Sequence, residues 1–185
     1  MKYLDPYGQE VAPGSEGEIC IRGPNVFKGY WQNESATENA FTDDGFFKTG
    51  DIGCEDDKGN LFITDRAKEL IKYKGFQVAP AELEGILTSH PKVVDAAVVG
   101  VWKDSEATEL PKAYVVLTPS AGKQDGAKTA RDIEGWMAKH TAHHKRLRGG
   151  VEFTDAIPRS PSGKILRRVL RDQAAWKGKK SQAKL

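Results

Sequence analysis

The organisation of this chain is set by one stretch, Asp65-Arg66-Ala67-Lys68-Glu69-Leu70-Ile71-Lys72-Tyr73-Lys74-Gly75-Phe76-Gln77-Val78-Ala79-Pro80. Along it the residues alternate in type, so that Ile71 and Tyr73 share one face of a strand and the lysines after each of them share the other. Gly75 then breaks the alternation. The pattern predicts a short hairpin with its turn at Lys74-Gly75.

This turn has the chemistry of an anion site. A lysine beside a turn glycine lets a cation and uncovered backbone N–H groups approach a ligand closely, because no Cβ stands in the way. The same residues, taken alone, also fit an ordinary surface hairpin with solvated lysines. The pattern by itself leaves both interpretations open.

The stretch from Asp65 to Pro80 resembles the hinge and following hairpin of the acyl-CoA synthetases. These are adenylate-forming (AMP-binding) enzymes that include 4-coumarate:CoA ligase and firefly luciferase. Two further motifs of that family are present in the family's order, Thr49-Gly50-Asp51 and Pro158-Arg159-Ser160-Pro161-Ser162-Gly163-Lys164. The three motifs span nearly the whole chain, and residues 70–80 are most similar to the 4-coumarate:CoA ligase branch.

The resemblance implies a division of the chain. Residues 1–64 correspond to the β-rich end of the family's large N-terminal domain, 65–68 to the hinge, and 69–185 to the mobile C-terminal domain, with a basic tail from about residue 174. The chain is therefore expected to be a C-terminal piece of a longer protein, with an artificial start at Met1.

Local patterns predict the elements of both parts. In the first part, three runs read as strands, 17–23, 46–52 and 61–64, and residues 33–41 read as a helix capped by Asn33. In the second part, helices are expected from Pro80 to about residue 90, near 133–140 and at 165–170, with strands at 93–101, 113–117 and 151–153 and a loop at 121–128. This order predicts an α+β fold, a small mixed sheet with helices on one face.

The resemblance assigns nucleotide contacts and a hinge. Asp51 matches the family's ribose contact, since a carboxylate can accept hydrogen bonds from both hydroxyls of a diol, although an Asp that merely closes a turn is the ordinary alternative. Arg66 matches a second ribose or phosphate contact, and Gln77 is also expected at the nucleotide. Lys68 falls at the hinge position.

Two lysines are the catalytic candidates. Lys164 matches the lysine that bridges the carboxylate substrate and the α-phosphate during adenylation, and a Gly-Lys pair before a helix suits an anion. Without the resemblance, a solvated lysine is the first interpretation of Lys164. Lys72 is the candidate for the second half-reaction. Coenzyme A contacts are expected at Lys74, Gly75 and Phe76.

The resemblance implies an acid–thiol ligase. Its substrates would be ATP, coenzyme A and a carboxylic acid, aromatic or medium-chain by the branch resembled. Mg²⁺ is expected from the N-terminal domain, which is the expected partner of this chain and carries the phosphate loop and the acyl pocket. The isolated chain is therefore not expected to be active. Luciferase-like oxidation remains an alternative.

The charge distribution suggests a rival class. The net charge is +2, but the segment from Lys164 to the end holds eight lysines and arginines against one acid, Asp172. A free-standing module that binds nucleic acid or an acidic partner is one alternative, and a non-catalytic relic is another. Because Trp176 is the one aromatic in that segment, a basic helix with a solvated tail is preferred, and no nucleic-acid partner is expected.

The remaining signals concern location and metals. No apolar run approaches the roughly 20 residues of a membrane span, and Cys20 and Cys54 read as reduced thiols of an intracellular protein. Ala183-Lys184-Leu185 fits a peroxisomal address read by the import receptor; otherwise the expectation is cytoplasmic. His143 and His144 lack a nearby acidic partner in sequence, so no metal site is expected.

Overall fold

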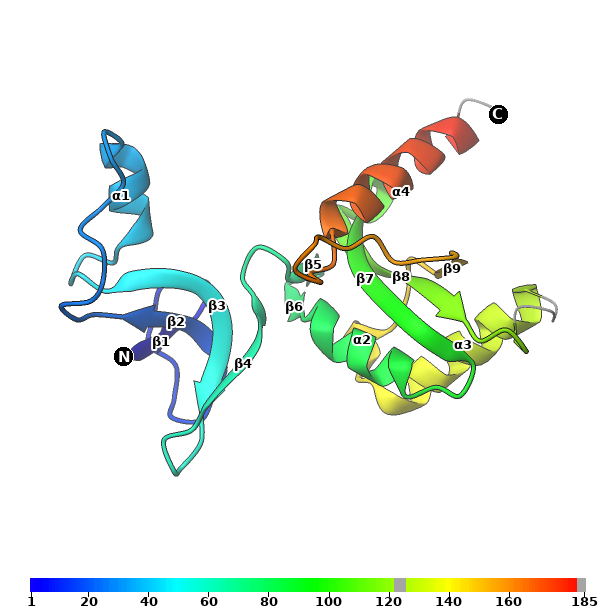
Figure 1. The fold of residues 1–185 in the computed structure, drawn as a ribbon, viewed down its shortest axis with the longest axis horizontal. Coiled ribbons are helices and arrows are strands. Elements are labelled where there is room, and N and C mark those ends of the chain that lie inside the picture. Colours follow the sequence, from blue (N-terminus) through cyan, green and yellow to red (C-terminus); the bar gives the residue numbers. More distant parts are fainter. Residues whose placement is uncertain (122–125, 183–185) are drawn as a thin grey trace. The chain divides into compact units, whose positions relative to one another are not determined.

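The computed structural model describes residues 1–121 and 126–182, the side chains of 177–182 excepted. The chain divides into two compact units, Met1–Lys68 (unit 1) and Glu69–Leu185 (unit 2), whose elements are labelled in Figure 1. Within the described ranges, no helix is long and apolar enough to cross a membrane. The segment 183–185, which carries the predicted peroxisomal address, lies outside the described residues.

Unit 1 is an antiparallel sheet with one short helix. Its strands lie in the order β1 (Lys2–Leu4), β2 (Gly17–Ile21), β3 (Phe47–Glu55) and β4 (Leu61–Arg66). Helix α1 (Glu34–Ala40) lies between β2 and β3 in the chain, and the Asn33 side chain accepts a hydrogen bond from the Ala36 N–H. The predicted strands and the cap are confirmed, and β3 extends further than expected.

A bulge separates the two halves of the β3–β4 pairing. Asp51 lies opposite Arg66 and Ile52 opposite Asp65, and the register then shifts before Gly53 pairs with Ile63. A Cβ on Gly53 would lie 2.2 Å from the Phe62 carbonyl oxygen, so this position requires glycine. The bulge therefore fixes which side chains face each other at the end of the pair.

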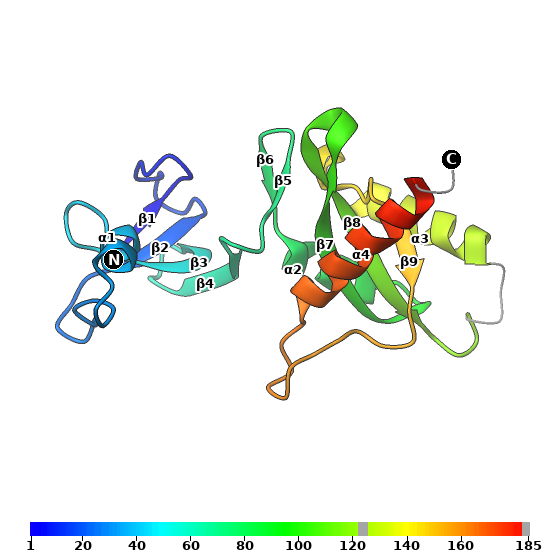
Figure 2. The same ribbon diagram turned by 90° about the horizontal axis from the view of Figure 1, so that it is seen from above.

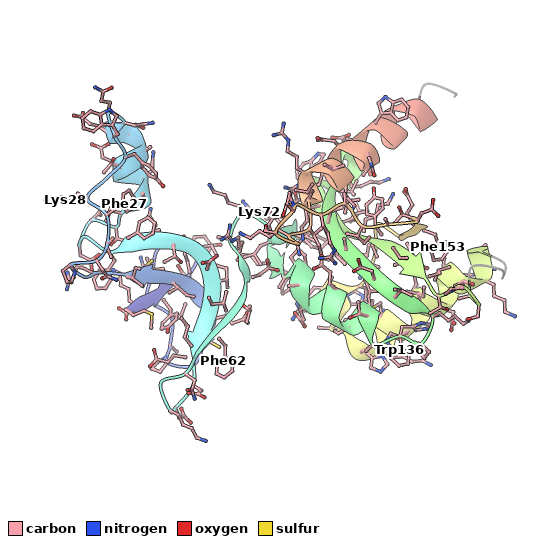
Figure 3. All side chains as sticks on the ribbon, viewed as in Figure 1. Phe27, Lys28, Phe62, Lys72, Trp136 and Phe153 are labelled. Atoms are coloured by element: carbon pink, nitrogen blue, oxygen red, sulfur yellow. The ribbon has the colours of Figure 1, made fainter. Side chains whose placement is uncertain are left out.

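Unit 1 leaves much apolar surface uncovered. Helix α1 has no buried residue, and on β4 the exposed fractions are 41% for Leu61, 52% for Phe62 and 62% for Ile63. The Phe62 side chain projects from the β3–β4 ribbon in Figure 3. Several large apolar side chains exposed on one strand are typical of a surface that another segment covers.

Unit 2 begins with the predicted hairpin. Strands β5 (Ile71–Tyr73) and β6 (Phe76–Val78) pair in antiparallel fashion. Both turn residues have positive φ, 46° at Lys74 and 84° at Gly75, as a type I′ turn demands. Ile71 and Tyr73 are buried while Lys72 and Lys74 are exposed, so the predicted facing is confirmed.

The main sheet of unit 2 is mixed, as predicted. Strands β7 (Val93–Lys103) and β8 (Thr108–Leu117) are antiparallel, and β8 and β9 (Val151–Phe153) are parallel. The remaining elements are the 3₁₀ turns η1 (Asp104–Glu106) and η2 (His143–Lys145) and the helices α2 (Pro80–Thr88), α3 (Gly126–His140) and α4 (Arg167–Gln182). The fold class is therefore α+β.

Helices cover both faces of this sheet, so the expectation of helices on one face was wrong. One core cluster joins Val98 and Val115 to Leu83 of α2 and Ile133 of α3, and a second joins Val99 and other sheet residues to Leu170 of α4. Since Ala96–Val99 are all buried, both alternating faces of β7 are apolar and each needs a cover. Figure 2 shows α4 lying across β7 and β8.

Two boundaries also differ from the predictions. Helix α3 begins at Gly126, inside the segment 121–128 predicted as loop. The prediction missed this start because the first buried residue of the helix is the polar Thr129, and a polar residue hides the helical period of apolar positions. Helix α4 starts only at Arg167, after Ile165 and Leu166, and continues to Gln182. Part of the predicted basic tail is therefore helical.

Candidate active site

Two of the three predicted nucleotide contacts, Asp51 and Arg66, meet at the end of the β3–β4 pair in unit 1, whereas the third, Gln77, lies on β6 of unit 2. Arg66 Nε lies 3.0 Å from Asp51 Oδ1, with 63% of the arginine side chain exposed. An ion pair this open contributes little to stability. Both side chains are therefore available to a ligand that offers hydroxyl or phosphate oxygens.

Backbone contacts hold the Thr49-Gly50-Asp51 motif in place. Thr49 Oγ1 donates to the Ile19 carbonyl at 2.8 Å and accepts the Asp51 N–H at 3.1 Å. Gly50, with φ 75°, donates its N–H to a Glu18 carboxylate oxygen at 3.2 Å. Beside the motif lies an open hollow of about 620 Å³, and among its lining residues are Thr49, Gly50, Arg66 and Lys68. The hinge candidate Lys68 is thus beside the nucleotide candidates.

The predicted coenzyme A and Lys72 positions lie on the β5–β6 hairpin. Lys72 and Gln77 are directly opposite each other across the two strands, and Lys72 is labelled in Figure 3. A Cβ on Gly75 would meet nothing within 4 Å, so the turn is open on the side where a side chain would stand. Phe76 is 53% exposed.

The rim of the hairpin is basic and aromatic. The Phe76 ring stacks on the His144 ring, with centroids 4.4 Å apart, and the Arg148 guanidinium lies 5.3 Å from the Tyr73 ring centre. A hydrogen bond to Glu106 raises the pKa of Lys74. Among the described residues, no group of three or more His, Cys, Asp or Glu side chains could hold a metal ion, and His144 serves here as a ring surface.

Side chains distant in sequence support this hairpin, and sequence patterns did not identify them. The Thr108 hydroxyl accepts the Lys74 N–H at 2.7 Å and donates to the Lys72 carbonyl at 2.9 Å. A Glu109 carboxylate oxygen accepts the Lys72 N–H at 2.7 Å. These contacts join positions more than thirty residues apart in the chain, so no local periodicity reveals them.

The loop that carries Lys164 is held as a tight turn before α4. The Gly163 N–H donates to the Ser160 carbonyl at 2.9 Å, and the Ser160 N–H donates to the Lys164 carbonyl at 2.8 Å. Arg159 clamps the loop, since its Nη2 contacts both Asp95 carboxylate oxygens, at 2.9 and 3.1 Å, and its Nη1 donates to the Gly163 carbonyl at 2.9 Å. The backbone at Lys164 is thus fixed while its side chain is exposed.

The two catalytic candidates are not brought together. Figure 2 shows the β5–β6 hairpin at one end of unit 2 and the orange loop before α4 at the other. The same segments overlap in Figure 1 because that view looks along their separation. The hairpin that carries Lys72 and the loop that carries Lys164 therefore lie apart in unit 2.

Comparison with known families decides what kind of domain this is. The family model of the AMP-binding enzyme C-terminal domain matches residues 82–164, and that of the AMP-binding enzyme matches residues 1–31. The chain belongs to the AMP-binding enzymes. The resemblance noted in the sequence is confirmed.

Individual relatives and solved structures agree with this membership of the AMP-binding enzymes. It is 52% identical over 176 residues to 4-coumarate–CoA ligase 1 of Glycine max, covering 95% of this chain and 58% of the relative. It is 47% identical over 174 residues to the phenylacetyl-CoA ligase epaB of Aspergillus niger, covering 93% and 31%. The solved structure of ATP-bound MatB from Rhodopseudomonas palustris matches with a TM-score of 0.80 and 36% identity, covering 93% and 33%. The chain spans about 30% of the length of several curated relatives that it matches.

Proposed function

We propose that this AMP-binding enzyme chain is the C-terminal part of a carboxylic acid:CoA ligase and supplies a different surface to each half of its reaction. The observation that carries the proposal is the placement of the Lys164 loop and the β5–β6 hairpin at opposite ends of unit 2 (Figure 2). A single small domain can present only one of these ends to one reaction centre at a time.

In the first half-reaction, a carboxylate oxygen attacks the α-phosphorus of ATP, and the bond to pyrophosphate breaks to leave an acyl-adenylate. Two anions must meet and negative charge grows on the phosphoryl oxygens, so a fixed cation stabilises the transition state. Lys164 has the exposed ammonium and the clamped backbone that this role needs. Asp51 and Arg66 in unit 1 would hold the ribose and phosphates.

In the second half-reaction, the sulfur of coenzyme A bonds to the acyl carbon, the bond to AMP breaks, and the thiol proton leaves to solvent. The small domain would turn at Lys68 to bring the hairpin to the acyl-adenylate. Gly75 leaves the space that the thiol arm needs, Lys72 and Gln77 face the ligand, and Lys74 and Phe76 offer charge and a ring surface.

The acid is proposed to be aromatic. The names of the relatives carry this inference, since a 4-coumarate ligase and a phenylacetyl-CoA ligase share about half of their aligned residues with this chain. Magnesium normally accompanies ATP, but the described residues offer no group of carboxylates and imidazoles for a metal. The Mg²⁺ site is therefore proposed to lie in the part of the protein that this chain does not span.

The partner of unit 1 is proposed to be the rest of the large AMP-binding domain. The exposed Leu61, Phe62 and Ile63 would pack against it, and the acyl pocket would lie there. The 185-residue chain by itself is then expected to bind substrates weakly at most and to catalyse neither half-reaction.

Half-reaction kinetics on the full-length enzyme test the proposal. Lys164→Ala should slow acid-dependent ATP–pyrophosphate exchange by about 10²- to 10³-fold and leave thiolysis of preformed acyl-AMP nearly unchanged. Lys72→Ala and Gly75→Leu should show the reverse pattern, and Lys58→Ala, an exposed turn lysine, should change neither. If Lys164→Ala and Lys72→Ala impaired both halves equally, the assignment of two surfaces would be wrong.

A peroxisomal location is proposed from Ala183-Lys184-Leu185, with cytoplasm as the alternative. The import receptor reads a free C-terminal tripeptide, so the proposal requires Leu185 to be the natural carboxyl terminus. A fluorescent protein carrying residues 167–185 should collect in peroxisomes, and the same fusion without Leu185 should stay diffuse. Diffuse fluorescence in both cases would contradict the proposal.

A further inference from the structure

We infer that Thr108 is a positioning residue for the thioester-forming half-reaction, because its hydroxyl holds the β5–β6 hairpin in the shape that presents Lys72 and Gly75. The inference rests on the proposed function and adds to it a residue outside the three motifs. Thr108 lies at the start of β8, on a different hairpin from the residues it would position.

The β5–β6 hairpin needs outside support. Each of its strands has three residues, and in the described residues the pair forms a two-stranded sheet of its own. Two-stranded hairpins of this length are marginally stable in water. The turn is also strained, since Lys74 is a non-glycine residue with φ 46°.

Thr108 supplies that support at the outer edge of β5. Lys72 lies opposite Gln77 and Tyr73 opposite Phe76, so the Lys72 carbonyl and the Lys74 N–H point away from β6. The Thr108 hydroxyl meets both groups, at 2.9 and 2.7 Å. One hydroxyl thereby satisfies the two backbone groups that a neighbouring strand would otherwise pair with on this edge.

The position of Thr108 is itself well defined. Its exposed fraction is 4%, and the preceding Ala107 has φ 48° and closes η1. The same turn contributes Glu109, which accepts the Lys72 N–H, and Glu106, which lies 2.9 Å from the Lys74 ammonium. The strained turn of the hairpin is therefore anchored to the end of the β7–β8 hairpin, with Thr108 at the centre.

Two substitutions separate the hydroxyl from the shape of the side chain. Valine has nearly the shape of threonine but no hydroxyl, so Thr108→Val would leave the Lys74 N–H and the Lys72 C=O, both in part-buried contacts, without this partner. Serine keeps the hydroxyl and loses only a methyl group. Because the Lys164 loop lies at the other end of unit 2 (Figure 2), neither change should reach the adenylation surface.

The test measures both half-reactions of the full-length enzyme. We expect Thr108→Val to lower the rate constant of acyl-AMP thiolysis by at least about tenfold, since small misplacements of reacting groups have effects of this order, and to leave ATP–pyrophosphate exchange within about twofold. Thr108→Ser should recover most of the thiolysis rate. The matched control is Thr118→Val, because the hydroxyl of Thr118 contacts a side chain near it in sequence, that of Ser120. This variant should change neither half-reaction.

Hydrogen exchange gives a readout that does not depend on activity. In the 185-residue chain, the Lys74 amide should exchange at least about tenfold faster in Thr108→Val than in Thr108→Ser. Unchanged exchange at Lys74, or equal losses in both half-reactions, would overturn the inference about Thr108. An unmodified full-length enzyme that performs neither half-reaction would instead overturn the proposed function, and the exchange result would still judge the hairpin contact.

Discussion

Removing the carboxylate of Glu84 should strongly destabilise unit 2. Glu84 of α2 lies 2.7 Å from Arg167 in the first turn of α4, and the two side chains are only 12% and 15% exposed. The same carboxylate accepts the Val98 N–H at 2.9 Å, at the edge of β7. The substitution Glu84→Ala therefore leaves a largely buried guanidinium without its counterion and removes the acceptor of the Val98 N–H on the free edge of β7.

The magnitude follows from this burial. Breaking a buried ion pair by removing one partner costs about 3–5 kcal/mol, because the remaining charge stays desolvated. Glu82→Ala on the same helix is the control, since the Glu82–Lys145 pair has side chains 42% and 25% exposed and should contribute at most about 1 kcal/mol.

Urea unfolding followed by tryptophan fluorescence measures the difference. A Trp31→Phe background removes the tryptophan of unit 1, which is 88% exposed, and leaves Trp102, Trp136 and Trp176 to report on unit 2. With a slope of about 2 kcal/mol per molar urea, a 4 kcal/mol loss lowers the midpoint by about 2 M. A loss for Glu84→Ala no larger than that for Glu82→Ala would refute the reasoning.

Two further predictions concern buried titratable groups. Burial lowers the pKa of His90, so the contribution of His90 to the free energy of unfolding is complete above the unfolded pKa of about 6.5 and is lost as pH falls through the lower folded pKa. The variant His90→Asn can still accept the Lys92 N–H and should flatten the decline of the free energy of unfolding between pH 7 and pH 5, measured by urea titrations. An unaltered decline would contradict this prediction. Burial also raises the pKa of the fully buried Cys20 to about 11, which lowers its reactivity as a thiolate. Iodoacetamide at pH 8 should therefore label the half-buried Cys54 well before Cys20 in the folded chain, as judged by peptide mass spectrometry. Equal labelling would show that Cys20 is accessible.

The elements that sequence patterns predicted are those whose signals are local. The hairpin turn at Lys74-Gly75 and the Asn33 cap each depend on neighbouring residues, and both are present. The start of α3 was missed because Thr129, a polar residue, is buried there. The family was recognised from contiguous motifs, and such motifs can be identified without any knowledge of the fold.

The sequence by itself determined the order of the elements, the α+β class, the family and the residues to consider at each surface. Tertiary structure alone decided that α4 covers the second face of the sheet, that Arg159 and Asp95 clamp the Lys164 loop, and that Thr108 supports the hairpin. The physical reason is that periodicity and turn chemistry act between near neighbours, whereas burial and hydrogen-bond partners depend on which distant segments the fold brings together. The separation of Lys72 from Lys164 is of this second kind, and the proposed mechanism depends on it.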